Sequence, residues 1–125
     1  MRTIRLELPF TVSAAVSELE LHAFEGNRDT SVDFFAMVGD VERRVTIRFQ
    51  RCICARLLSF GWTASGGTLV EIVDSPWLQE ASAFQRQYFP DSPDTTAELH
   101  HYFIRGHDAC VEVLASGLVW EAPLQ

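Results

Sequence analysis

Histidine, aspartate and cysteine side chains gather within eleven consecutive positions of the chain. Such groups are what a transition metal binds, and the stretch contains His100, His101, His107, Asp108 and Cys110. However, His100 and His101 are neighbours on an expected strand, so their side chains leave on opposite faces. The stretch also lacks a His-x-His pair and an H-E-x-x-H helix. We therefore expect no metal and no cofactor, with His107 and Asp108 serving as turn residues.

The three cysteines are a second candidate for chemistry. Cys52 and Cys54 form a C-x-C pair whose thiols point the same way on a regular strand, and Cys110 joins them if the strands are neighbours. Three thiolates would still need a fourth ligand to hold a tetrahedral ion. An odd count without framework spacing also speaks against disulfides. We expect three free, unmetallated thiols, as in the cytoplasm.

All ten cationic residues are arginines, and half of them fall within fourteen positions. Arg44 and Arg48 share a strand face and could form a fork that binds carboxylate or phosphate. A solvated face paired with Glu18 or Glu20 is the plainer interpretation. The net charge of −7 argues against general binding to nucleic-acid phosphates.

The chain shows no sequence motif of a catalytic centre. No serine lies in a G-x-S-x-G elbow, and Gly66-Gly67 lacks the spacing of a phosphate-binding loop. A nucleophilic cysteine would need a base and an electropositive pocket, which the sequence does not indicate. We therefore expect no catalytic residues and favour a protein that is not an enzyme.

The segment from Glu98 to Ala115 predicts the central β-hairpin. Its loop is either the two-residue pair Gly106-His107 or the four residues Gly106–Ala109. Both loops have even length, so both predict the same core face. That face carries His100, Tyr102, Ile104, Val111, Val113 and Ala115.

The opposite face of this hairpin mixes polar and apolar side chains. It carries His101, Phe103, Arg105, Cys110, Glu112 and Leu114. We expect the helix to cover it in part, with His101 and Glu112 facing the helix side or solvent. If the face is wet, replacing Glu112 costs little. Polar groups on a partly apolar face also suit a ligand pocket. The candidate binding residues are Arg44, Arg48, His101, Arg105, His107 and Glu112.

One helix is predicted over residues 76–88. Asp74 or Ser75 caps it, and Pro76 takes the first position, where its missing N–H costs nothing. An apolar stripe recurs at helical spacing and is expected to join the core. The stripe consists of Trp77, Ala81, Phe84 and Tyr88, with Leu78 beside it.

The remaining patterns predict strands, about seven in all. Gly39-Asp40 joins one hairpin, in whose second arm Val45, Ile47 and Phe49 face inward. A bulge near Gln50-Arg51 is expected to return Arg51 to solvent and to turn Cys52 and Cys54 inward. The other strands are expected at 3–8, 18–24, 68–73 and 118–121. The fold class is α+β, mostly β: an antiparallel curled sheet, sandwich or barrel-like, with one principal helix in a single domain of residues 1–125.

The chain has no apolar run of the roughly 20 residues that span a bilayer, and its N-terminus alternates apolar and charged residues, unlike a signal peptide. We expect a cytoplasmic bacterial protein without membrane association.

Four segments carry a resemblance to known proteins: DSPWL at Asp74–Leu78, HHYFI at His100–Ile104, CVEVLA at Cys110–Ala115 and VTIRFQRC at Val45–Cys52. Over roughly residues 41–120 the chain resembles a family of small uncharacterised bacterial proteins. That resemblance implies a stand-alone domain of unknown function. In size, acidity and hairpin order the chain is more loosely similar to immunity proteins of bacterial toxin systems.

Two functional hypotheses follow. The first is a non-catalytic protein that acts through protein–protein interaction, immunity-like or homodimeric, and it draws on the acidic charge and the lack of a catalytic constellation. The alternative is a small-ligand-binding protein or metal-assisted enzyme that uses the face of His101, Arg105 and Glu112.

Overall fold

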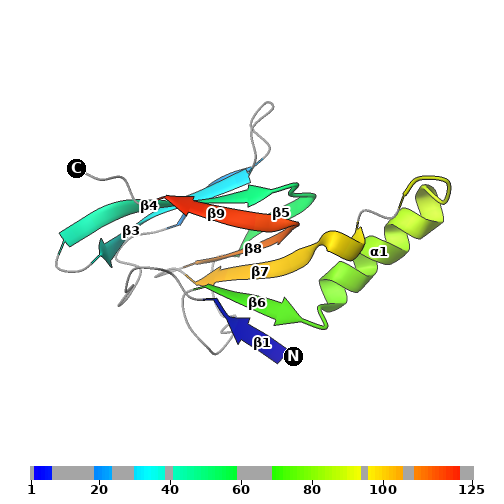
Figure 1. Ribbon diagram of the computed structural model, residues 1–125, viewed down its shortest axis with the longest axis horizontal. Coiled ribbons are helices and arrows are strands. Elements are labelled where there is room, and N and C mark those ends of the chain that lie inside the picture. The colour runs from blue at the N-terminus through cyan, green and yellow to red at the C-terminus, as the bar shows by residue number, and fades with distance from the viewer. Residues whose placement is uncertain are drawn as a thin grey trace.

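The computed structural model describes residues 2–6, 19–23, 30–38, 41–58, 69–93, 96–105 and 109–121. These residues form two antiparallel sheets and one α-helix (Figure 1). The elements are β1 (Arg2–Arg5), β2 (Glu20–His22), β3 (Thr30–Val38), β4 (Val41–Gln50), β5 (Cys54–Leu58), β6 (Leu69–Val73), α1 (Pro76–Tyr88), a short 3₁₀ helix η1 (Thr96–Glu98), β7 (His100–Arg105), β8 (Cys110–Ala115) and β9 (Gly117–Glu121).

The two sheets enclose one main core between them. The larger sheet has the strand order β1-β6-β7-β8-β5, and the smaller one has the order β2-β3-β4-β9. Buried residues of both sheets meet in this core, and the rings of Phe49 and Tyr102 contact across it with their centroids 5.6 Å apart. The prediction of a mostly β, antiparallel fold with one principal helix is confirmed, with nine strands in the described part of the chain instead of about seven.

The register of β7 and β8 confirms the predicted core face of the central hairpin. Tyr102 lies opposite Val113, and Ile104 lies opposite Val111. All four side chains are buried in the main core. The pairing of Arg105 with Cys110 leaves four residues between the strands, which selects the longer of the two loops. His107 itself lies outside the described residues, as does most of that loop.

The hairpin of β3 and β4 also follows its prediction. Val38 pairs with Val41, which leaves Gly39-Asp40 between the strands, although these two residues lie outside the described ranges. Val45, Ile47 and Phe49 are fully buried. Alternation of side chains along a strand explains this burial, because a shift by one residue would expose all three.

A sharp corner at Arg51 carries the chain from one sheet to the other. Arg51 has a φ of 49°, in the left-handed region, and its exposed side chain reaches Glu98 at 3.3 Å. Arg51 therefore points to solvent, as predicted. Cys52 packs against the main core, also as predicted, but Cys54 faces the helix side. The expectation that Cys54 turns inward is wrong because β5 begins only at Cys54, so strand alternation does not extend back to Cys52.

The helix has the predicted bounds and cap. Ser75 is its N-cap: the Ser75 hydroxyl oxygen accepts a hydrogen bond from the Leu78 N–H at 3.1 Å, and Pro76 follows it. The preceding residue, Asp74, has a φ of 58° and makes the tight turn from β6 into α1. Figure 1 shows α1 extending from this turn beyond the end of the sheets.

The predicted core position of the helical aromatic stripe is wrong. No residue of α1 is buried, and the side chains of Phe84 and Tyr88 are 57% and 58% exposed. Only the first turns of the helix lie against the larger sheet, whereas the later turns pass its end (Figure 1). Three members of the stripe, Trp77, Ala81 and Phe84, therefore line a surface groove, described below. Within the described residues, no helix is long and apolar enough to cross a membrane.

The register of the central hairpin predicts that replacing Ile104 by alanine destabilises the protein more than replacing Ile4 does. Ile104 is fully buried, whereas Ile4 on β1 is 48% exposed. Replacement Ile104→Ala should lower the free energy of unfolding by about 2–5 kcal/mol, because it empties a core site. Replacement Ile4→Ala removes the same atoms and should cost about 1 kcal/mol or less. Chemical denaturation measures both, and equal losses would contradict the register.

Candidate functional site

A buried polar network lies between the larger sheet and the first turn of α1. Arg56 on β5 and Glu112 on β8 are cross-strand partners, and the Arg56 Nε–H donates to Glu112 Oε2 at 2.7 Å. On β7, His101 Nε2 lies 2.8 Å from Glu112 Oε1. On its other side, His101 Nδ1 lies 2.6 Å from the Ser75 hydroxyl oxygen. Strands β5, β7 and β8 and the helix cap at Ser75 are therefore linked through the Glu112 carboxylate and the His101 imidazole.

The charges of this network balance. Glu112 is 1% exposed. Burial by itself raises the pKa of its carboxyl group, but the hydrogen bonds from His101 and Arg56 outweigh burial and hold the pKa below its ordinary value. Arg56 neutralises the resulting carboxylate, and the His101 imidazole completes the network. Its Nε2 contacts Glu112 and its Nδ1 contacts the Ser75 hydroxyl, and the tautomer of the ring sets which atom donates in each contact. Every buried polar group then has a partner.

Trp77 closes the network from the helix side. Its ring meets the His101 ring edge-on, with centroids 5.2 Å apart. The Arg56 guanidinium lies over the Trp77 ring, 4.1 Å from its centroid, in a cation–π contact. Arg56 thus holds both Glu112 and Trp77, so one side chain joins the sheet to the helix.

The order Ser75–His101–Glu112 has the connectivity of a nucleophile, its base and an orienting carboxylate. The surroundings oppose that function. Ser75 and His101 are each only 3% exposed, and the Ser75 oxygen already caps the helix by accepting the Leu78 N–H. A substrate would have to displace the start of α1 to reach the hydroxyl. The arrangement is suited to anchoring the helix.

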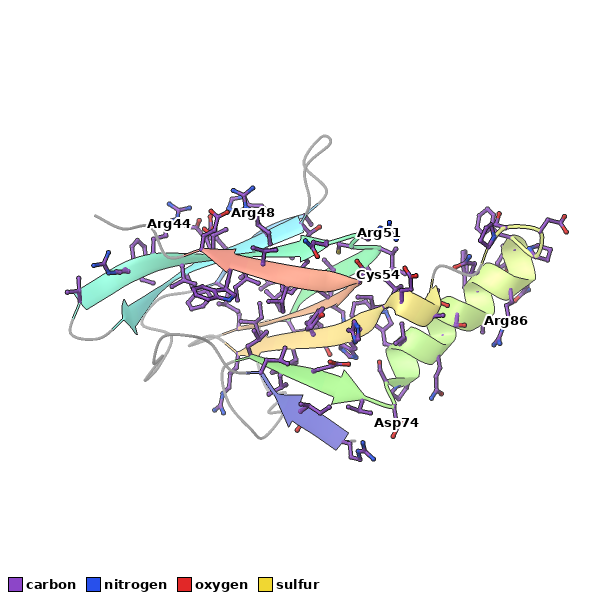
Figure 2. All side chains as sticks on the ribbon, in the orientation of Figure 1. Arg44, Arg48, Arg51, Cys54, Asp74 and Arg86 are labelled. Atoms are coloured by element: carbon purple, nitrogen blue, oxygen red, sulfur yellow. The ribbon has the colours of Figure 1, made fainter. Side chains whose placement is uncertain are left out.

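A largely apolar groove of about 690 Å³ lies beside this anchor, bounded by α1, the start of β5 and the segment after the helix. Its only charged lining residue is Glu80, among the residues that the structure describes. Figure 2 shows Cys54 at the end of the sheets that adjoins α1. The principal apolar lining residues are Ile53, Cys54, Trp77, Ala81, Phe84 and Phe89.

The thiols show no sign of activation. Burial raises the pKa of the Cys54 thiol, and the nearby Arg56 only partly offsets it. Burial and the Glu112 carboxylate raise the pKa of Cys110. Both thiols are therefore protonated at neutral pH, which is unfavourable for nucleophilic attack.

Arg44 and Arg48 lie on the smaller sheet, away from this network, and each has its own acidic partner. Arg44 donates to Asp33 at 2.6 Å, and Arg48 lies 3.5 Å from Glu121. Burial raises the pKa of the Asp33 carboxyl group, but hydrogen bonds from Thr46 and Arg44 and the charge of Arg44 lower it overall. These contacts match the interpretation of a strand face paired with acids.

Glu20, His22 and Asp33 form the one group of three potential metal ligands found among the described residues, with ligand atoms within 4.8 Å of one another. The Arg44 guanidinium lies 2.6 Å from Asp33 and 3.7 Å from Glu20. It therefore holds the place that a cation would take. We assign no metal to this group.

Of the five candidate residues that the structure describes, it brings His101 and Glu112 together, while His107 lies outside the described residues. Arg105 is exposed at the far end of β7, opposite Cys110. Of the two surroundings expected for His101 and Glu112, helix side or solvent, the structure shows the helix side, because α1 and Arg56 cover this face. Sequence reasoning missed Arg56, Ser75 and Trp77 as members of the network. One signal was present: Arg56 is the only charge in the strand CARLL, and such a charge needs an acidic partner when buried.

Comparison of the chain with family models, curated proteins and solved structures finds no match. The function must therefore be argued from the geometry of the network and the groove.

Removal of the buried carboxylate should destabilise the protein strongly. Glu112→Ala leaves the buried His101 ring without one hydrogen-bond partner and the Arg56 side chain, which is 45% exposed, without its ion pair, and we expect a loss of about 2–3 kcal/mol. The control Glu98→Ala removes an exposed pair with Arg51 and should cost about 1 kcal/mol or less. Denaturant unfolding measures both losses. A small loss for Glu112→Ala would show that the network does not anchor the fold.

The lowered pKa of Glu112 also predicts an acid dependence of stability. The folded protein binds this proton less readily than the unfolded chain, whose glutamate pKa is about 4.3. The stabilisation is therefore complete above that value and is lost as the pH falls through the lower folded pKa. We expect the stability difference between the wild type and Glu112→Gln to narrow as the pH falls from 7 to 3. A constant difference would contradict this assignment.

Proposed function

We propose that this chain is a non-catalytic, cytoplasmic bacterial protein that binds a protein partner through the apolar groove beside α1. The observation that carries the proposal is the exposure of large aromatic side chains at this groove. Phe84 and Phe89 line it and are 57% and 55% exposed, and Tyr88 lies beside Phe84. Contiguous exposed apolar surface of this kind marks interaction sites.

The buried network supports this function by fixing one wall of the groove. Trp77 belongs to both the network and the groove, so the bonds of Arg56, His101 and Ser75 hold that wall before a partner arrives. A preformed surface loses less conformational entropy on binding. The network thus favours affinity without taking part in a reaction.

The composition of the groove favours binding over chemistry. Its lining is mainly apolar, and the Cys54 thiol is protonated at neutral pH. Glu80 and the net charge of −7 favour a partner with cationic residues. An immunity-like protein that neutralises a basic partner is the form of the proposal that this charge supports.

A small apolar ligand is the second candidate. The groove volume of about 690 Å³ lies within the range of roughly 300–1,000 Å³ that small-molecule sites occupy. This candidate differs from the face of His101, Arg105 and Glu112 considered above, because none of these three residues lines the groove.

Selection from a random peptide library displayed on phage tests the proposal. We expect enriched peptides that combine apolar and basic residues. Their affinity should fall at least about tenfold for Phe84→Ser, because a central aromatic contact is removed. The control Phe35→Ser changes a 44% exposed phenylalanine on β3 and should leave affinity unchanged.

Two outcomes would overturn the protein-partner proposal. One is the absence of any enriched peptide family. The other is enrichment of peptides that bind Phe84→Ser as well as the wild type. In the first case, binding of the neutral dye Nile red that depends on Phe84 would favour the small-ligand candidate.

A further inference from the structure

We infer that the partner binds as an extended segment that adds a sixth strand to the larger sheet, at the outer edge of β5. This inference rests on the proposed function and specifies how the groove is filled. The edge of a sheet offers backbone N–H and C=O groups to a new strand, and side chains at alternate positions then give specificity.

The strand order places this edge beside the groove. β5 ends the larger sheet, and among the described residues it pairs with β8 alone. The groove begins at Ile53 and Cys54, where β5 starts. A segment laid along β5 would therefore pass directly beneath the exposed side of α1.

Among the residues that the structure describes, the edge of β5 carries little of the charge that normally protects edge strands. Charged side chains usually guard such edges against pairing. Of the other three sheet edges, β1 contains Arg2, β2 contains Glu20 and His22, and β9 carries Glu121, which pairs with Arg48. In β5 the single charge, Arg56, is turned back onto Glu112 and Trp77.

Exposed apolar side chains on β5 provide a contact for each face of an added strand. Cys54 and Arg56 face α1, whereas Ala55 packs toward the main core. Leu57 alternates with Arg56 and is 51% exposed. A neighbouring strand would place alternate side chains in the groove and the others over Leu57, because strand side chains alternate with period two. The occupant is thus apolar on both faces.

Charge decides between a different protein and a second copy. Two copies would each bring a net charge of −7, and an antiparallel pairing centred on the five residues of β5 would set two Arg56 side chains opposite each other. Like charges in that position are destabilising. A segment of another protein with flanking Lys or Arg near Glu80 avoids both the repulsion between two acidic chains and the pairing of two Arg56 side chains.

The peptides selected above provide the probe, and two edge variants provide the first test. Leu57→Glu places a carboxylate on the β5 edge and should weaken peptide binding at least tenfold. Glutamate is chosen because it would attract a basic peptide, so a loss reports the blocked edge. Val119→Glu is the matched control: Val119 is 46% exposed on β9, an edge of the smaller sheet that does not line the groove. The Val119→Glu variant should bind the peptides with an affinity within twofold of that of the wild type.

Backbone methylation of the peptides provides the second test. Only alternate N–H groups of an added strand point to its neighbour. Methylation of one alternate set of amides should therefore abolish binding, whereas methylation of the other set should preserve it.

The failure of this inference can be told apart from failure of the proposed function. Peptides that need Phe84 but tolerate Leu57→Glu and both methylation sets would overturn strand addition and leave groove binding in place. Dimerisation of the free protein in sedimentation, lost in Leu57→Glu, would overturn it in favour of a second copy. Absence of any enriched peptide would overturn both.

Discussion

The charge of one buried carboxylate, Glu112, sets the conditions for the rest of this structure. A carboxylate removed from water needs compensating charge and hydrogen bonds. Arg56 supplies the charge and His101 the second bond. Each of these partners then constrains something else, since Arg56 lies over Trp77 and His101 bonds to the helix cap at Ser75. A single electrostatic requirement thereby ties the start of α1, which Ser75 and Pro76 set locally, to the larger sheet.

Attachment at one end explains how a well-capped helix can have no buried residue. The capping and aromatic contacts lie at Ser75 and Trp77, whereas Phe84 and Tyr88 are two to three turns farther along. In many small domains an amphipathic helix covers a sheet face along its whole length. Here the apolar stripe continues past the end of the sheet (Figure 1). Burial of the first turn thus leaves the remainder of the stripe available to a partner.

The sequence allowed local features to be predicted well and long-range ones poorly. Alternation in VTIRFQ specified which face of β4 is buried, and the pattern of HHYFIR specified which side chains of β7 enter the main core. Ser75-Pro76 specified the helix start, because these signals lie within a few residues of what they determine. The Arg56–Glu112 pair joins residues 56 positions apart, and it forms only because the corner at Arg51 moves the chain between sheets. The aromatic stripe indicated an apolar surface, but helical spacing cannot say what covers it.

The left-handed turn at Asp74 has a mechanical consequence. Because α1 meets the larger sheet through its first turn, a rotation about Asp74 would move the helix as a lever arm. With a rise of 1.5 Å per residue, 13 residues span about 20 Å, so a rotation of about 10° at the fulcrum displaces the far end by about 3 Å. The wall near Trp77 would hardly move, whereas Phe84 and Phe89 would travel much farther. Such a rotation would change the width of the groove least beside Trp77 and most beside Phe84 and Phe89.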